Sequence, residues 1–160
     1  MPRHVDWLLA ALALAALVVV GMRLKAPADA VSGQARVIDG DTIELGGRRL
    51  RLAGMDAPEL SQLCERAGTT YRCGEAAREA LRDLVRQGIQ CTVSGQDRYG
   101  RGLATCTAGG PDLGGLLVRS GMAVAYGRYE AEERHAASLQ LGLWAGRFER
   151  PAEWRKAHPR

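Results

Sequence analysis

The residues best suited to chemistry are four carboxylates within 21 positions. Asp39 and Asp41 belong to an Asp-Gly-Asp-Thr segment, and Asp56 and Glu59 belong to a Met-Asp-Ala-Pro-Glu segment. Carboxylates that converge without His or Cys favour a hard cation with oxygen ligands, Ca²⁺ or Mg²⁺, over zinc or iron. An EF-hand is excluded because Ile43 takes the third ligand position of that loop. The alternative is that both segments serve only as turns.

Arginines are the second set of candidates. Arg98 and Arg101 belong to a glycine-containing turn, and Arg51 lies on a predicted strand. A guanidinium binds phosphate through two parallel hydrogen bonds, so Arg51 and Arg101 can clamp one phosphodiester. A metal held by Asp41 and Asp56 would neutralise another phosphate oxygen, which completes the requirements of phosphoryl transfer. Each arginine taken alone is better explained as a solvated surface charge.

Short strands must position these side chains. Apolar and β-branched runs between glycine-rich turns predict five strands. They cover residues 35–38, 42–45, 48–53, 89–93 and 103–107. Because side chains alternate along a strand, Leu50 and Leu52 share one face and Arg49 and Arg51 share the other. Arg51 is therefore directed away from the leucines.

The same alternation gives Asp41 an ambiguous direction. In a regular strand Asp41 has the parity of Ile43, which turns it toward the interior and away from the Arg51 face. A bulge at Gly40, or a place for Asp41 at the mouth of a barrel, would resolve the conflict.

Helices complete the predicted fold. Apolar residues at helical spacing, with charged residues opposite, predict a helix over residues 74–87, and shorter helices are expected at 112–120 and 130–141. The order favours an α+β fold, a five-stranded OB-type barrel with about three packed helices, whose face commonly binds oligonucleotides. A generic α+β sandwich is the alternative. Residues 144–160 either pack on this body or hang loose after Pro151.

An N-terminal hydrophobic helix is predicted ahead of this domain. Residues 7–22 carry no charge. The length of this run lies between that of the apolar core of a signal peptide and that of a membrane-spanning helix. Ala26, Ala28 and Ala30 fit a cleavage site, whereas Arg23 and Lys25 fit an uncleaved anchor. We therefore divide the chain into residues 1–30, a signal peptide or membrane anchor, and residues 31–160, a single domain located outside the cytoplasm.

Composition permits this reading but does not name a ligand. The chain is 46% hydrophobic and 25% charged, which excludes collagen, mucin-like disorder and multi-pass membrane proteins. Its formal charge of +4 permits an anionic partner without requiring one. Nearly all basic residues are arginine, which suits phosphate binding but also follows from codon bias.

Four cysteines support an oxidising compartment, where an even number usually forms disulfides. Zinc is the rival interpretation, but there is no Cys-x-x-Cys motif and no nearby histidine. Of three possible pairings we favour Cys64 with Cys73, closing a loop, and Cys91 with Cys106, joining two predicted strands.

Three segments resemble a known family in order and spacing. Residues 34–42, 51–59 and 97–104 resemble successive signatures of the thermonucleases, the staphylococcal-nuclease-like family, and residues 117–126 and 142–144 also match in order. The resemblance spans about residues 33–155. It implies an OB-type barrel with packed helices that hydrolyses DNA and RNA with Ca²⁺ and leaves 3′-phosphate ends.

The resemblance also implies roles for individual residues. Asp41, Asp56 and the carbonyl of Ala57 correspond to metal ligands, and Glu59 corresponds to the general base. Arg51 and Arg101 correspond to the arginines that hold the scissile phosphate. Tyr126 corresponds to a tyrosine near the nucleotide, and Arg98 is a further candidate for substrate binding. Two departures stand out: Ala57 replaces a threonine, and the second nucleotide-contacting tyrosine has no clear match.

The leading hypothesis is therefore an exported, monomeric, Ca²⁺-dependent phosphodiesterase that acts on single- or double-stranded DNA and RNA with little sequence preference. If residues 7–22 are retained, it would also contact a membrane. The alternative is a non-catalytic OB-type module that binds nucleic acid or an envelope protein.

Overall fold

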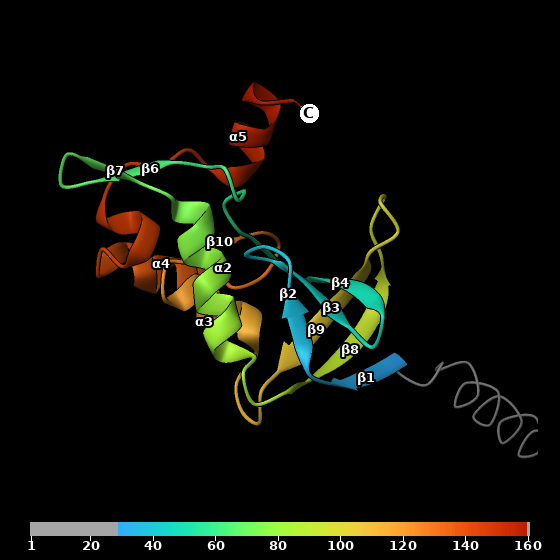
Figure 1. The fold of residues 1–160 in the computed structure, drawn as a ribbon. Coiled ribbons are helices and arrows are strands. Elements are labelled where there is room, and N and C mark those ends of the chain that lie inside the picture. The colour runs from blue at the N-terminus through green and yellow to red at the C-terminus, as the bar shows by residue number, and fades with distance from the viewer. Residues whose placement is uncertain (1–28, 160) are drawn as a thin grey trace, which may run out of the picture.

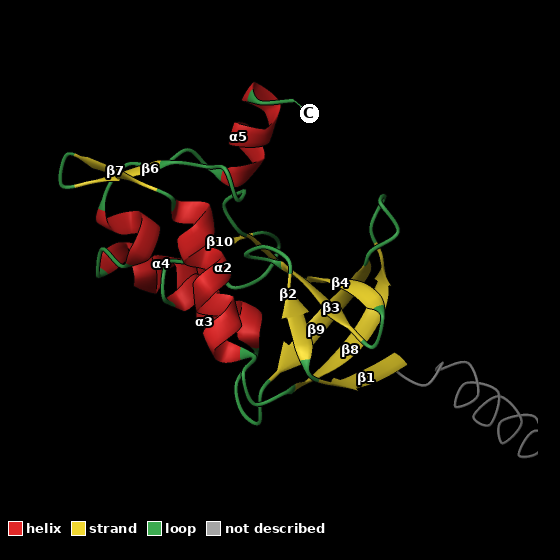
Figure 2. Cartoon of the chain, viewed as in Figure 1, coloured by secondary structure: helices red, strands yellow, loops and turns green. Residues whose placement is uncertain are grey.

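A computed structural model describes residues 29–159, and the hydrophobic segment predicted at residues 7–22 lies outside this range. The fold is α+β, with a curled half-barrel of strands on one side and helices α2, α3 and α4 on the other (Figures 1 and 2). In the part of the chain that is described, no helix is both long and apolar enough to span a lipid bilayer.

The main sheet has six strands, one more than the sequence predicts. Their order is β1-β8-β9-β4-β3-β2. The strands are β1 (Asp29–Gly33), β2 (Ala35–Val37), β3 (Thr42–Leu45), β4 (Arg48–Leu52), β8 (Ile89–Gln96) and β9 (Gly102–Thr107). Neighbours are antiparallel except β4 and β9, which are parallel. β1 is the additional strand: it lacks alternating hydrophobic residues and is formed by pairing with β8, starting two residues before the expected domain boundary.

Two small strand pairs accompany this sheet. β5 (Met55–Asp56) pairs with β10 (Val124–Ala125), and β6 (Cys64–Arg66) pairs with β7 (Thr69–Tyr71). Neither pair is predicted from the sequence, because strands of two or three residues are too short to show a hydrophobic periodicity. The first pair fixes the backbone of Asp56, which lies opposite Val124.

Residues 29–159 contain four α-helices, where about three were expected. They are α2 (Cys73–Leu84), α3 (Leu113–Arg119), α4 (Glu130–Ser138) and α5 (Pro151–Ala157), with a 3₁₀ helix η1 (Gly142–Ala145) before α5. The first three correspond to the predicted helices. α5 is the additional one: Pro151 occupies its first turn, where a missing N–H costs nothing.

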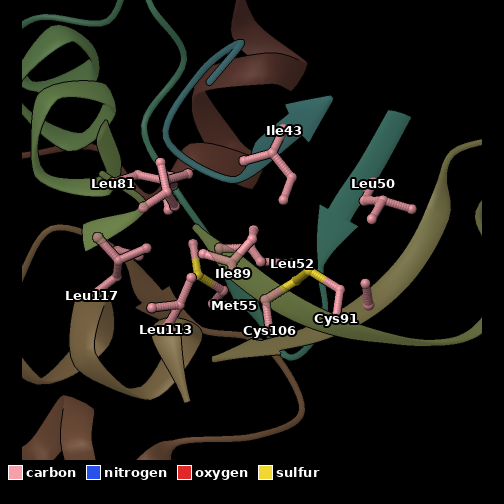
Figure 3. Close-up of a cluster of buried hydrophobic side chains, with 14 of the residues drawn as sticks. Ile43, Leu50, Leu52, Met55, Leu81, Ile89, Cys91, Cys106, Leu113 and Leu117 are labelled. Carbon is pink, nitrogen blue, oxygen red and sulfur yellow. A yellow bond between two sulfur atoms is a disulfide. The ribbon is translucent and has the colours of Figure 1, made fainter. Parts of the chain in front are cut away.

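The hydrophobic core lies between the sheet and helices α2 and α3 (Figure 3). Ile43 and Leu50 from the sheet, and Leu81 from α2, have no exposed surface. Cys91 and Cys106 are directly opposite each other on β8 and β9 and form a disulfide inside this core, as expected. The core therefore supports β4, which carries Arg51, and β3, which begins directly after Asp41.

Candidate active site

A tight turn before β3 positions Asp41. The Asp41 amide donates a hydrogen bond to the Asp39 side chain at 3.0 Å, and the Asp41 carbonyl accepts one from Leu52 at 2.8 Å. A Cβ on Gly40 would approach the Cβ of Ala57 to 2.7 Å, so only glycine allows this turn to pack against the segment after Asp56. Asp41 thus lies at the end of the strand, in agreement with a location at the barrel mouth.

Arg51 of β4 joins the two predicted metal ligands. Its Nη1 lies 2.6 Å from Asp41 Oδ2, and its Nη2 lies 2.7 Å from Asp56 Oδ1. The three side chains are largely buried, with exposures of 17% for Arg51, 6% for Asp41 and 3% for Asp56. Three side chains from a turn and two strands therefore converge at one place, as predicted from the sequence.

Burial dominates the electrostatics of Asp41. Desolvation raises the pKa of Asp41 to about 7, although Arg51 opposes this effect, and the nearby charges of Asp39 and Asp56 raise it further. For Arg51, burial alone would lower the pKa, but the two aspartates outweigh it and raise the pKa above its ordinary value. The ion pair with Arg51 therefore offsets only part of the effect of burial on the pKa of Asp41.

Arg101 reaches the same cluster from the hairpin between β8 and β9. Its Nε donates to Asp97 Oδ2 at 2.8 Å and its Nη1 donates to the Thr42 hydroxyl at 3.1 Å. Thr42 in turn donates to Asp41 Oδ1 at 2.8 Å. Thr42 thus links the second predicted phosphate-binding arginine to the carboxylate pair.

The predicted substrate contacts lie on the surface around this cluster. Arg98 is exposed, with its guanidinium over the ring of Tyr99 at 4.8 Å. Tyr126 is 69% exposed, and its amide donates to the carbonyl of Gly54, close to β5. The roles of Arg98 and Tyr126 in substrate binding remain predictions.

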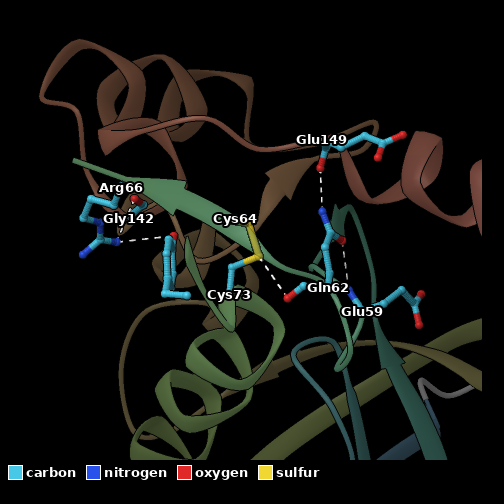
Figure 4. Close-up of a disulfide and its surroundings, with 8 residues drawn as sticks. Glu59, Gln62, Cys64, Arg66, Cys73, Gly142 and Glu149 are labelled. Carbon is cyan, nitrogen blue, oxygen red and sulfur yellow. Dashed lines mark hydrogen bonds between the residues drawn. A yellow bond between two sulfur atoms is a disulfide. The ribbon is translucent and has the colours of Figure 1, made fainter. Parts of the chain in front are cut away.

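A buried glutamine network holds the segment that carries Glu59. Gln62 has no exposed surface; its Oε1 accepts from the Glu59 amide at 3.2 Å and its Nε2 donates to the Glu149 carbonyl at 2.7 Å (Figure 4). The adjacent disulfide joins Cys64 to Cys73, the pairing favoured from the sequence. A buried side chain and a disulfide therefore fix the position of the predicted base.

Arg155 is the site residue that the sequence analysis missed. From α5, its Nη1 and Nη2 donate to the two oxygens of Asp56 at 3.0 and 2.8 Å, and Nη1 also lies 3.2 Å from Glu59 Oε1. Pro151 signals a helix start, but no local pattern connects that helix with Asp56, 99 positions earlier. The carboxylates raise the pKa of Arg155 above its ordinary value, so it is fully charged.

The donor atoms fit a hard cation. Asp41 and Asp56 each place a carboxylate oxygen against the same Arg51 guanidinium, and carboxylate oxygens are the ligands that hard cations prefer. Within residues 29–159, no three His, Cys, Asp or Glu side chains converge as a metal site. The expected set is smaller, two carboxylates and a backbone carbonyl, and Ala57 is buried directly after Asp56. Water would complete such a shell.

Comparison with known proteins agrees with this geometry. Residues 49–146 match the family described as staphylococcal nuclease homologue. The chain is 38% identical to micrococcal nuclease of Shigella flexneri over 168 aligned positions, covering 91% of each. It is 40% identical over 126 residues to the succinoglycan biosynthesis protein ExoI of Rhizobium meliloti strain 1021, covering 73% of this chain and 66% of that protein. An uncharacterized endonuclease of Haemophilus influenzae is 31% identical over 134 residues, covering 76% and 70%.

Proposed function

This chain belongs to the staphylococcal nuclease family, and we propose that it is a Ca²⁺-dependent nuclease that hydrolyses DNA and RNA with little sequence preference. The observation that carries the proposal is the convergence of Asp41, Arg51 and Asp56 within hydrogen-bonding distance. Two buried carboxylates beside an arginine favour a metal-dependent enzyme over a fold that only binds nucleic acid, because carboxylates repel the phosphate backbone.

Asp41, Asp56 and the Ala57 carbonyl would hold the metal. When bound, the ion supplies positive charge to a phosphate oxygen and fixes the orientation of the phosphodiester. The buried position of the two aspartates favours this role, because low solvent exposure strengthens their attraction to a cation.

Arg51 and Arg101 would bind the scissile phosphate from two sides. Both side chains are mostly buried, at 17% and 22% exposure, and each is held in place by a carboxylate partner. Fixed donors stabilise the charge that develops in the transition state without reorganising during the reaction. Arg51 comes from β4 and Arg101 from the β8–β9 hairpin, so the phosphate would lie between two elements of the barrel.

Glu59 would accept the proton of the attacking water. The water oxygen forms a bond to phosphorus and the bond from phosphorus to the 5′ oxygen breaks. The leaving 5′ oxygen takes a proton from a second water molecule, and the resulting hydroxide is neutralised by the proton that Glu59 has gained. The phosphate then stays on the 3′ side, which gives the 3′-phosphate end. The Gln62 network supports this role, because it fixes the backbone of Glu59 on the side of the metal ligands.

We also propose that the protein works outside the cytoplasm. Its two disulfides fit an oxidising compartment. The uncharged run at residues 7–22 fits export or anchoring.

The test is cleavage by the purified full chain. Plasmid DNA, heat-denatured DNA and RNA are incubated with Ca²⁺, with Mg²⁺ or with EDTA, and the products are separated on gels. We expect cleavage of all three substrates with Ca²⁺ and none with EDTA. DNA products should resist extension by a polymerase until a phosphatase removes the 3′-phosphate.

An Asp41→Asn/Asp56→Asn double variant is the matched control. It preserves the shape of both side chains but removes their charges, so any residual cleavage measures a contaminating nuclease. Metal-independent binding without cleavage by the wild-type chain would instead support the non-catalytic module.

A further inference from the structure

The Arg155 contact uses both oxygens of a predicted metal ligand. Asp56 Oδ1 accepts from Arg51 at 2.7 Å and from Arg155 at 3.0 Å, and Oδ2 accepts from Arg155 at 2.8 Å. A cation coordinated by Asp56 needs one of these lone-pair directions. Arg155 is the easier group to displace, because its side chain is 40% exposed whereas that of Arg51 is 17% exposed.

The helix that carries Arg155 is fixed at its beginning and exposed toward its end. Pro151 is buried, Arg150 pairs with Glu133 at 2.9 Å, and the Glu149 carbonyl accepts a hydrogen bond from Gln62. α5 itself stands apart from the other helices (Figure 1). The Arg155 side chain can therefore leave Asp56 without unfolding the anchored start of α5.

Charge determines where Arg155 would go. Three carboxylates, Asp41, Asp56 and Glu59, contact two guanidiniums, so the group carries one net negative charge when all are ionised. A divalent cation reverses this to one net positive charge, which a phosphodiester anion balances. The displaced guanidinium would then lie beside a bound phosphate, its best available partner.

We propose that Arg155 is a third phosphate-binding residue, which pairs with Asp56 in the metal-free protein and transfers to the substrate when a divalent cation binds. The inference rests on the proposed function, because it takes Asp56 as a metal ligand. The same transfer removes the Arg155 contact from Glu59. Arg155 would thereby couple metal binding to substrate binding.

Two measurements on the full chain test this, using Arg155→Met. Calorimetric titration with CaCl₂, without nucleic acid, should show metal binding about two- to fivefold tighter than in the wild type, because a competitor for Asp56 is gone. Kinetics on oligothymidylate at saturating Ca²⁺ should show KM raised about tenfold or more with kcat little changed, because a charge-assisted phosphate contact is lost. Tighter binding of Ca²⁺ together with a higher KM for the oligonucleotide would indicate that Arg155 moves from Asp56 to the substrate.

Two further variants provide the controls. Lys156→Met removes the same charge from the neighbouring position of α5, where the side chain is 73% exposed, and should change neither quantity. Arg155→Lys keeps the charge but loses the bidentate geometry of the guanidinium. Its KM should therefore lie between those of the wild type and Arg155→Met.

Each alternative outcome has a distinct meaning. If Arg155→Met leaves the Ca²⁺ affinity unchanged, Arg155 does not compete with the metal for Asp56. If KM is unchanged, Arg155 pairs with Asp56 in the metal-free protein but does not bind substrate. If both the Ca²⁺ affinity and the substrate affinity fall, Arg155 has only a structural role. Each of these would overturn this proposal while the wild type still cleaves DNA. A wild-type chain without Ca²⁺-dependent cleavage would overturn the proposed function, and this inference with it.

Discussion

The two halves of the candidate site are built in different ways. The barrel half contains Thr42 and Arg51, from the adjacent strands β3 and β4, and Asp41, from the turn directly before β3. The C-terminal half contains Glu59 and Arg155, which are brought together by contacts between residues almost a hundred positions apart. The first half is mostly buried, while Arg155 is 40% exposed.

This difference indicates a division of labour. Rigid, buried charges suit the binding of a metal and a phosphate, because fixed charges need no reorganisation. A more exposed, tethered arginine suits a step that changes partners during the reaction cycle. Substitutions in the barrel half should therefore change both the stability and the rate of cleavage. Substitutions in the C-terminal half should change the rate of cleavage without changing the stability.

Arg51→Ala should have the largest effect. It leaves Asp41 without its ion pair and takes one of the two arginines from Asp56, which should lower the free energy of unfolding by about 3–5 kcal/mol. Loss of the phosphate contact should also reduce kcat/KM by about 10²- to 10³-fold. Urea denaturation and DNA cleavage measure the two effects. Arg49→Ala, an exposed position on the same strand, is the matched control and should be nearly silent.

Glu59→Gln should abolish chemistry with no loss of stability. Removal of the base should lower kcat by about 10²- to 10⁴-fold. The amide oxygen can still accept from Arg155, so the thermal midpoint should remain unchanged. Glu65→Gln, a nearby carboxylate on β6, controls for the loss of charge. A reduction below about tenfold in Glu59→Gln would reject Glu59 as the base.

Loss of either disulfide should have a moderate effect on stability, and loss of only one of them should also affect kcat. Replacing either pair by alanines should lower the free energy of unfolding by about 3 kcal/mol. Only Cys64→Ala/Cys73→Ala should also reduce kcat of the folded protein, by about tenfold, because this disulfide adjoins the Gln62 network that positions Glu59. Cleavage rates measured well below both thermal midpoints separate the two variants. Equal rates would mean that the network does not depend on its disulfide.

The barrel half could be predicted from the sequence because its signals are local. The turn at Gly40 and the alternation of Leu50, Arg51 and Leu52 each involve only a few neighbouring residues. The positions of Asp41 and Arg51 could therefore be predicted from them. The direction of Asp41 was ambiguous, because alternation does not show where a strand begins; β3 begins at Thr42, one residue later.

The C-terminal half could not be derived in the same way. The role of Glu59 came only from family resemblance, and Arg155 has no local signal that links it to Asp56. α5 has seven residues, too few to form stably without tertiary contacts. Those contacts, through Pro151 and Gln62, depend on how separate segments pack in the folded protein. Hydrophobic periodicity describes each segment alone and does not predict that packing.

The smallest expected effect is the pH dependence of stability through Asp41. Its pKa in the folded protein is raised to about 7 from an ordinary 3.8, so the folded state favours the protonated carboxyl. The resulting stabilisation is complete below about pH 4 and is lost as the pH rises through about 7. Asp41→Asn cannot ionise. In EDTA, the stability of this variant relative to the wild type should therefore increase between pH 4 and pH 7, as urea denaturation would show. Addition of Ca²⁺ at pH 8 should reverse the order, because only the wild type gains the binding energy of the metal. A difference between the two proteins that does not vary with pH would mean that Asp41 is ionised throughout, and that Arg51 alone compensates its charge.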